Sequence, residues 1–547
     1  MSATSQANAT DRRADAAGAE RVSVLLCSVD DPTHAGQAAL AAALLASGCS
    51  VAVLPNADGS EEAGSALAEL RAVDGLTVLD PGADGRTAGT LGPSAYAARV
   101  ETAAKGFDAI LALGLRTGAA LAQRPELRGR LCACLDEIPG NVGELTERQR
   151  GRLAEVAESA RLCAVRTESQ RSFLETEIPA FAGRTVLSGE PGGERLGHAL
   201  RRTFGRQRLF AQDRGTQKLL LAGYDFKFMG ELVELLGRDP RIELAYDKWP
   251  GTGARSRPVD KRLFHSADVI FCEWSAANAV WYSQHKRAGQ KLIVRLHRFE
   301  MDRPWVHQID YRNVDAFVVV SEHMAQRMRA ETGVDPAQLH VIPNMVDTVD
   351  FVRPKAVGSE FRIGIAGIVP MRKRPDRALA LARELRRIDP RFTLHIRGRL
   401  PSSYREFSTD GAFRLYYQEL YRQFLLPGAG GDLHGTVFAE RFGADMANWF
   451  RRMGWILSPS TDESFHLAVA EGMASGALPV LWDWTGAADI YRPGDVFPDD
   501  PRAIAEHIVE TVRSGAWGEQ SIAAQRFIAG YDTETVHRRW IELFRSL

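Results

Sequence analysis

Cysteine is scarce in this sequence, with six residues in a chain of 547 and no Cys-x-x-Cys pair. Five lie within apolar, strand-like runs and one stands just before such a run; they are Cys27, Cys49, Cys132, Cys134, Cys163 and Cys272. Thiols in such runs are typical of buried, reduced side chains in a cytosolic protein. No second pair of ligands accompanies Cys132 and Cys134, so the sequence predicts neither a disulfide framework nor a zinc site.

An excess of charge of either sign is also lacking. The 68 Lys and Arg residues balance 69 Asp and Glu residues, which leaves a formal net charge of −1 at pH 7. This balance excludes a general electrostatic attraction to nucleic acid, so we predict no nucleic-acid partner. The apolar content of 45% is that of a soluble globular protein.

No apolar run is long enough to cross a membrane. Residues 32–57 contain no Asp, Glu, Lys or Arg, but Gly48 and Cys49 divide them into an Ala-rich helix and a short strand. A membrane span needs about 20 predominantly apolar residues without such a break. Residues 1–20 predict a disordered tail rather than a signal peptide. The sequence thus indicates a cytoplasmic protein without a transmembrane segment, with peripheral membrane contact as the alternative.

What the sequence does contain is a series of short apolar runs separated by helix-length segments. Such runs are typical of parallel strands buried on both faces of a sheet. We therefore predict an α/β protein of three doubly wound, Rossmann-like domains, in keeping with about 100–200 residues per domain. The predicted bounds are 21–200, 216–355 and 356–526, followed by a C-terminal helix over 527–547.

The first two predicted domains follow similar plans. Leu131–Asp136 corresponds to Leu292–His297, and Asp108–Gly114 corresponds to Asp268–Trp274, in the same order and at similar spacing. Any two parallel sheets share runs of this type. Duplication and a merely common architecture therefore both stay open.

Residues 461–480 follow an apolar strand and predict the start of a helix. Ser464 is a suitable N-cap, so we expect the helix to begin there. The first-turn amides would then have no partner within the helix and, with the helix dipole, would suit a pyrophosphate. These amides belong to Phe465, His466 and Leu467.

Two acidic residues frame this helix start. Glu471 lies about two helical turns after Glu463, so the two carboxylates are predicted to border one cleft. The alternative is an amphipathic helix that exposes two glutamates to solvent.

This segment resembles the Glu-x7-Glu signature of glycosyltransferase family 4, whose usual form is Glu-Ser/Pro-Phe-Gly-Leu-x-x-x-Glu-Ala-Met-Ala-x-Gly-x-Pro-Val. About eight positions agree besides the two acids, and the resemblance extends over about residues 217–547. It implies the GT-B fold, with the first Rossmann-like domain as an addition, and a C-terminal helix that crosses back to the N-terminal domain of the pair. It also implies that Glu463 holds hydroxyls of the donor sugar and that Glu471 accepts from the ribose hydroxyls.

A basic cluster precedes this segment. The stretch from Gly367 to Arg374 is similar to the glycine loop and lysine of the family, and Lys373 would stabilise the departing diphosphate. The arginine that usually follows the glycine is Ile368 here, and Arg372 or Arg374 could replace it. The alternative is an exposed basic helix start.

His297 ends a predicted strand, at the edge where open α/β sheets bind ligands. The resemblance implies a histidine here that contacts the donor sugar, although Arg298 and Glu300 depart from the usual residues after it. Asp225 and Lys227 lie in a loop that could meet an acceptor or could simply be solvated.

The resemblance implies a retaining glycosyltransferase that uses a nucleoside diphosphate sugar, in the UDP or GDP form, to build a glycan, capsule or glycoconjugate. Its acceptor, whether a glycan, a lipid-linked sugar or a protein, is not specified by the sequence. No cofactor and no metal are expected. The alternatives are a sugar-nucleotide epimerase of the same fold and a non-catalytic glycan-binding or scaffold protein.

Overall fold

The computed structural model describes residues 21–29, 35–56, 61–79, 91–135, 138, 145–188, 192–205, 208–210, 215–253, 260–427, 432–443 and 445–547. The predicted disordered tail over 1–20 lies outside these residues, as does the end of the Leu131–Asp136 run. The chain divides into two compact units, Met1–Arg208 and Leu209–Leu547.

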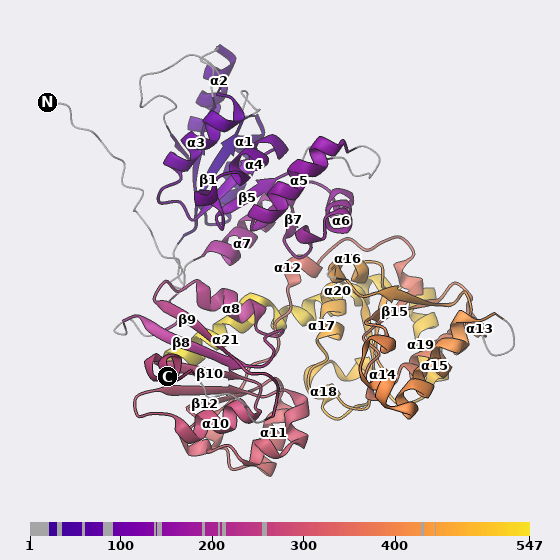
Figure 1. Cartoon of the computed structure of the whole chain (residues 1–547). Coiled ribbons are helices and arrows are strands. Elements are labelled where there is room, and N and C mark those ends of the chain that lie inside the picture. Colours follow the sequence, from indigo (N-terminus) through magenta and orange to yellow (C-terminus); the bar gives the residue numbers. More distant parts are fainter. Residues whose placement is uncertain are drawn as a thin grey trace. The chain divides into compact units, whose positions relative to one another are not determined.

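The first unit is built on a seven-stranded parallel sheet in the order β3-β2-β1-β4-β5-β6-β7. Its strands are β1 (Ser23–Ser28), β2 (Ser50–Leu54), β3 (Thr77–Val78), β4 (Ala109–Leu113), β5 (Leu131–Cys134), β6 (Leu162–Val165) and β7 (Thr185–Leu187). Helices flank this sheet (Figure 1): α1 (Ala35–Ala46), α2 (Glu61–Arg71), α3 (Pro93–Ala103), α4 (Leu115–Ala122), α5 (Glu147–Ser159), α6 (Glu168–Glu177) and α7 (Gly192–Phe204). The strand order reverses at β1, as in doubly wound sheets.

The second unit contains two six-stranded parallel sheets, of which the first has the order β13-β12-β11-β10-β8-β9. Its strands are β8 (Gln217–Gly223), β9 (Ile242–Lys248), β10 (Val269–Glu273), β11 (Lys291–Arg295), β12 (Ala316–Val319) and β13 (Leu339–Val341). Its α-helices are α8 (Gly230–Gly237), α9 (Lys261–Ser266), α10 (Ala277–His285) and α11 (Glu322–Glu331). Every residue of β10 is buried, and the first four, Val269–Cys272, form an apolar run in the sequence.

The second of these sheets has the order β16-β15-β14-β17-β18-β19. Its strands are β14 (Arg362–Ala366), β15 (Thr393–Gly398), β16 (Val437–Arg441), β17 (Trp455–Ser458), β18 (Leu478–Trp482) and β19 (Val496–Phe497). Its α-helices are α12 (Thr348–Phe351), α13 (Pro375–Ile388), α14 (Glu406–Thr409), α15 (Gly411–Leu425), α16 (Met446–Phe450), α17 (Leu467–Ala474), α18 (Ala487–Ile490), α19 (Pro501–Arg513) and α20 (Trp517–Ile528). The three parallel sheets confirm the predicted α/β architecture.

The C-terminal helix α21 (Thr533–Ser546) packs against the β8–β13 sheet rather than against the sheet that precedes it in sequence. Trp540 and Phe544 are buried with Leu219 and Phe271, and the Phe271 and Trp540 ring centroids are 5.6 Å apart. The prediction of one helix from residue 527 is wrong, because Phe527 belongs to α20 and the Asp532 carboxylate caps a new helix by accepting from the Glu534 amide.

The first sheet of each unit contains the same local interaction, between an aspartate and a backbone amide. Asp108, just before β4, accepts from the Ser23 amide at 2.9 Å, and Asp268, just before β10, accepts from the Lys218 amide at 2.8 Å. Each carboxylate thereby ties a strand to its central neighbour. The strands matched in sequence also occupy the same places, since β4-β5-β6-β7 and β10-β11-β12-β13 follow their central strands in that order.

Candidate functional site

The loops that follow β14 and β17 bring basic and acidic side chains into contact. These strands are parallel neighbours, so their carboxyl ends meet at one edge of the sheet. Lys373 Nζ lies 2.6 Å from Glu463 Oε1, and the Arg372 guanidinium lies 3.1 Å from the same oxygen. Ser460 Oγ donates to it as well, at 2.8 Å. The structure thus joins three residues that the sequence predicted for the donor site.

Glu463 is ionised in this arrangement. Burial opposes its ionisation, but the neighbouring basic groups outweigh burial and lower the pKa of Glu463 to about 2. Burial lowers the pKa of Lys373, and Glu463 offsets only part of that effect. The site therefore holds a buried, hydrogen-bonded carboxylate whose cationic partners could also serve an anionic ligand.

Of the two arginines that could replace the missing family arginine, only Arg372 turns toward Glu463. Ile368 is 2% exposed and belongs to the hydrophobic core, so its side chain faces away from the loop. Arg374 pairs with Asp376 at 2.7 Å. Arg372 donates to the carbonyl of Asp462 in addition to contacting Glu463.

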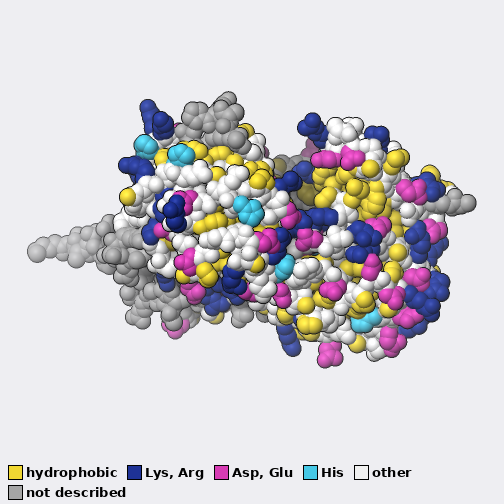
Figure 2. Space-filling model, turned by 90° about the horizontal axis from the view of Figure 1, so that it is seen from below, with side chains coloured by type: hydrophobic (Ala, Val, Ile, Leu, Met, Phe, Trp, Pro, Cys, Tyr) yellow, Lys and Arg dark blue, Asp and Glu magenta, His cyan; other side chains and the backbone are white. Residues whose placement is uncertain are grey.

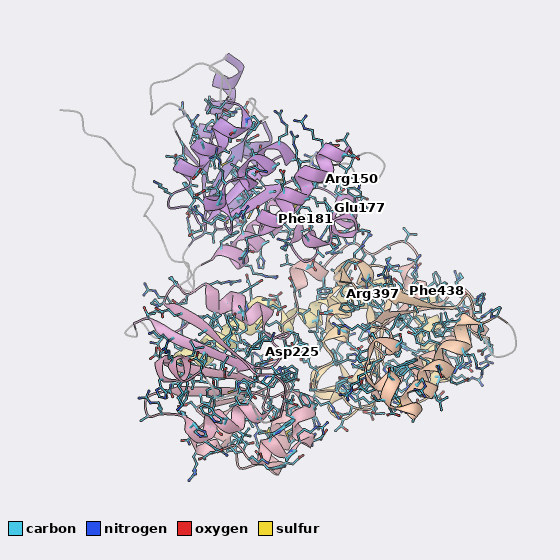
Figure 3. The ribbon with its side chains drawn as sticks, viewed as in Figure 1. Arg150, Glu177, Phe181, Asp225, Arg397 and Phe438 are labelled. Carbon is cyan, nitrogen blue, oxygen red and sulfur yellow. The ribbon has the colours of Figure 1, made fainter. Side chains whose placement is uncertain are left out.

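Gly367 contributes only its backbone to this loop. Its φ is 76°, and its amide donates at 2.8 Å to the carbonyl of Arg397, which is labelled in Figure 3.

Helix α17 begins later than the sequence predicts. Its first residue is Leu467, and the residue that precedes it, His466, has a left-handed φ of 55°. The proposal that Ser464 caps this helix is wrong, because the chain turns at His466 after Ser464 has already passed in a bend. No side chain caps the helix, and no described residue accepts a hydrogen bond from the amide of Leu467 or Ala468. The helix therefore starts two residues beyond the predicted place, and its first turn, which includes the predicted Leu467 amide, still presents bare amides.

Glu471 lies inside α17 in an acidic setting. Burial raises the pKa of its carboxyl to about 8, and the charges of Glu231, Asp350 and Asp347 act in the same direction. The side chain is therefore protonated at neutral pH in the ligand-free protein. Gly472 follows it, and a Cβ there would lie 2.9 Å from Ile456 Cβ, so this glycine allows α17 to approach β17 closely.

His297 lies at the carboxyl edge of the β8–β13 sheet and is held from several sides. Its Nε2 is 2.7 Å from the carboxylate of Glu273, and its ring packs against those of Trp274 and Phe228, with centroids 4.2 Å and 4.9 Å away. Burial lowers the pKa of His297, which keeps the ring neutral at physiological pH. Glu300, whose pKa burial raises to about 8, accepts from the His297 amide.

Asp225 and Lys227 lie in the loop after β8. Lys227 Nζ is 3.3 Å from Asp225 and 5.4 Å from the centre of the Trp274 ring, and Asp225 is labelled in Figure 3. Both side chains retain solvent exposure. The loop is thus joined to the His297 surroundings through Trp274.

Sequence reasoning did not find a contact between the two domains of the second unit. Arg298, next to His297, forms an ion pair with Asp462, next to Glu463. The departure of Arg298 from the family pattern was the available signal. Ser458, which contacts His466, and Trp484, which donates to Ser458, were missed too, because strand-end residues of this kind carry no spacing of their own.

Two parallel doubly wound sheets in one unit, with a helix from the second domain returning to the first, are the architecture of GT-B glycosyltransferases. Residues 212–350 match the family model of Glycosyltransferase Family 4, and residues 360–514 match that of Glycosyl transferases group 1. Together these matches cover more than half of the chain, which therefore belongs to the family 4 glycosyltransferases and is an enzyme of that class.

Solved structures with similar folds include HepE of Anabaena in complex with UDP-glucose, at 16% identity and a TM-score of 0.47, with 60% of this chain and 100% of HepE covered. TarM matches at 16% identity and a TM-score of 0.41, over 50% of this chain and 54% of its own, so the chain spans about half the length of TarM. Sucrose-phosphate synthase of Thermosynechococcus elongatus matches at 15% identity and a TM-score of 0.45, over 60% and 98%. No curated protein sequence matches the chain significantly.

Within the described ranges, no helix combines the length and the apolar character needed to cross a bilayer. The same ranges contain no group of three or more His, Cys, Asp or Glu side chains placed to hold a metal ion. On the face that Figure 2 draws, basic and acidic side chains are interspersed, in keeping with the near-zero net charge.

Proposed function

We propose that the chain is a retaining glycosyltransferase that moves a sugar from a nucleoside diphosphate sugar, in the UDP or GDP form, to an acceptor hydroxyl. The observation that carries the proposal is the convergence of Lys373 and Arg372 on Glu463, directly before a helix whose first amides are bare. Two cations and a helix N-terminus suit a diphosphate, and a buried carboxylate suits sugar hydroxyls.

In the proposed reaction, the bond from the anomeric carbon to the diphosphate breaks and a bond to the acceptor oxygen forms on the same face. The acceptor proton leaves with the diphosphate. Charge grows on the departing diphosphate as the sugar becomes oxocarbenium-like. Lys373 and Arg372 are the groups placed to stabilise that charge, together with the amides of Leu467 and Ala468.

The carboxylates have different parts in this proposal. Glu463 is ionised and would accept hydrogen bonds from the donor sugar. Glu471 is protonated before the donor arrives, so it can both accept from and donate to the ribose hydroxyls. His297 would contact the sugar from the other domain, with Glu273 fixing its ring, and the loop of Asp225 and Lys227 would face the acceptor.

The proposed setting is the cytoplasm, in the synthesis of a glycan, capsule or glycoconjugate. The proposed acceptor is a hydroxyl of a glycan, a lipid-linked sugar or a protein. A thermal-shift screen with UDP, GDP and their sugars tests the donor class, because a ligand that binds only the native state raises the unfolding temperature. Absence of any shift with all of these ligands would contradict the proposal.

The variant Glu463→Gln tests the site itself. Removing the charge frees Lys373 and Arg372 from their carboxylate while losing the acceptor for sugar hydroxyls. We expect kcat to fall by about 100-fold or more, whereas UDP binds at least as tightly as before. Turnover and isothermal calorimetry measure the two effects.

Asp389→Asn is the matched control for this variant. Asp389 is a carboxylate whose pKa is likewise lowered by an arginine, Arg391, but it lies before β15, at the opposite edge of the sheet. We expect it to leave turnover unchanged. Full turnover by Glu463→Gln would remove Glu463 from the proposed mechanism.

A further inference from the structure

Three described residues other than glycine have a positive φ: Trp274 at 73°, Arg374 at 48° and His466 at 55°. L side chains rarely adopt this conformation, and residues held in it cluster at ligand sites. Each of the three adjoins the candidate site, since Trp274 packs on His297, Arg374 follows Lys373, and His466 lies between Glu463 and α17.

The backbone at His466 is fixed by several hydrogen bonds. Its carbonyl accepts from the Val469 amide at 2.9 Å and from the Tyr491 hydroxyl at 3.2 Å, and that hydroxyl also donates to the carbonyl of Phe465 at 2.7 Å. The turn therefore keeps its shape independently of the imidazole. A glycine would fit this backbone without strain, so the presence of a histidine calls for a reason in its side chain.

The imidazole is held in one orientation. Nδ1 lies 2.5 Å from Ser458 Oγ, which in turn accepts from the indole N–H of Trp484 at 3.0 Å. Only 8% of His466 is exposed. These contacts come from the ends of β17 and β18 and turn the ring's other nitrogen, Nε2, away from Ser458.

The hydrogen-bond partners also determine which nitrogen carries the proton. A serine hydroxyl has one hydrogen, and with a lone pair occupied by Trp484 it satisfies Nδ1 best by donating that hydrogen. Burial lowers the pKa of His466 to about 3, so the ring is neutral and has a single N–H. That N–H is then on Nε2, for which the described residues provide no hydrogen-bond partner.

We propose that His466 determines specificity for the donor sugar. Its Nε2–H donates a hydrogen bond to a hydroxyl of that sugar. The neutral N–H of His466 and the carboxylate of Glu463 together complement a sugar hydroxyl, which accepts one hydrogen bond while it donates another. In the proposed function, Lys373 and Arg372 stabilise the anionic diphosphate instead. This inference rests on the proposed function and names the part of the ligand that His466 recognises.

The test compares His466→Gly and His466→Asn with the wild type in the full chain. Binding of UDP and GDP is measured by calorimetry, and kcat/KM is measured with UDP-glucose, UDP-N-acetylglucosamine and GDP-mannose. For His466→Gly we expect nucleotide affinity within about twofold of the wild type and a loss of about tenfold or more in kcat/KM for the preferred sugar. The discrimination between sugars on the same nucleotide should shrink. His466→Asn should recover part of the loss, since asparagine tolerates this backbone and its amide can donate.

His340→Asn is the control, because burial also lowers the pKa of this histidine, which lies in β13 outside the candidate site. It should keep both measurements within about twofold of the wild type. Unchanged sugar discrimination in His466→Gly would overturn the inference, and so would a parallel loss of UDP affinity, which would place the contact on the diphosphate. A wild-type protein that binds none of the nucleotides or donors would instead overturn the proposed function.

Discussion

At the scale of single residues, the two glutamates of the signature occupy opposite electrostatic environments. Glu463 meets Lys373 and Arg372, whereas Glu471 faces the acidic residues Glu231 and Asp350. The first carboxyl is ionised down to a pH of about 2, and the second holds its proton up to about 8. Glu463 can thus accept hydrogen bonds from hydroxyl groups, and Glu471 can both donate and accept them.

The raised pKa of Glu471 predicts how stability depends on pH. The folded state binds the Glu471 proton more tightly than the unfolded state does, so this group favours folding at low pH, and that contribution is lost as pH rises from about 4 to about 8. Glu471→Gln removes this dependence. We expect the free energy of unfolding of the variant, relative to that of the wild type, to be higher at pH 8 than at pH 5 by at least about 1 kcal/mol.

Chemical denaturation at pH 5, 6.5 and 8 measures this gain. Glu300 also has a raised pKa and changes wild-type stability in the same direction, but it is present in both proteins and cancels in the comparison. A constant difference across the three pH values would show that Glu471 is ionised in the folded state at neutral pH.

The choice between Arg372 and Arg374 shows where residue-level prediction ends. Sequence placed the basic cluster beside Glu463, because the order of motifs along a parallel sheet brings loops from neighbouring strands to one edge. It could not say which arginine turns inward. Arg374 points elsewhere because its backbone is left-handed, with a φ of 48°, and because its side chain pairs with the carboxylate of Asp376. No sequence pattern predicts this backbone conformation.

At the scale of elements, strands that contain an apolar run were predictable, and two edge strands without a clear run were not. The inner strands β14 and β17 appear in the sequence as apolar runs, since both faces are covered. The edge strands β16 and β19 were missed: three of the five residues of β16 are exposed, and β19 has only two residues. An edge strand needs no continuous apolar run, so its sequence carries little signal.

The position of α17 relative to β17 depends on Gly472. A methyl group there would lie 2.9 Å from both Cβ and Cγ2 of Ile456, inside a packed core. We expect Gly472→Ala to destabilise the protein by about 1–3 kcal/mol and to lower turnover, since the helix carries Glu471 and the bare amides. Denaturation and kinetic assays measure the two effects.

Gly518 is the matched control, because it also lies in a helix, α20, and a Cβ there would meet no atom within 4 Å. Gly518→Ala should be neutral or slightly stabilising, since alanine has the higher helix propensity. If both alanine variants were equally stable, close packing at Gly472 would not determine the position of α17.

At the scale of the whole molecule, the start of the glycosyltransferase unit is set by two apolar residues that precede its first strand. Leu209 and Phe210 are buried in the core of the second unit, and the Phe210 ring lies 5.5 Å from that of Phe544. The Leu209 amide also donates to Asp239 at 2.8 Å. The sequence placed this boundary at residue 216, because the polar stretch around these residues hides their packing.

This packing predicts a difference between two truncated proteins. Residues 209–547 should fold and bind UDP or GDP as the full chain does, whereas residues 216–547 should be less stable by a few kcal/mol, since burying a leucine or phenylalanine side chain contributes about 1.5–3 kcal/mol. Thermal unfolding and calorimetry compare them. If the longer fragment folds but binds no nucleotide that the full chain binds, residues 1–208 are part of the donor site.

The ion pair between Arg298 and Asp462 joins the loops that carry His297 and Glu463. If it aligns the two domains for reaction, Arg298→Gln and Asp462→Asn should each lower kcat/KM by about tenfold, and the double variant should be no worse than either single one, because the same interaction is lost only once. Arg502 and Glu506, an exposed pair in α19 with a separation of 3.0 Å, provide the control cycle and should show no coupling. Additive losses from Arg298→Gln and Asp462→Asn would mean that each side chain acts alone. The contact would then have no part in bringing His297 and Glu463 to one substrate.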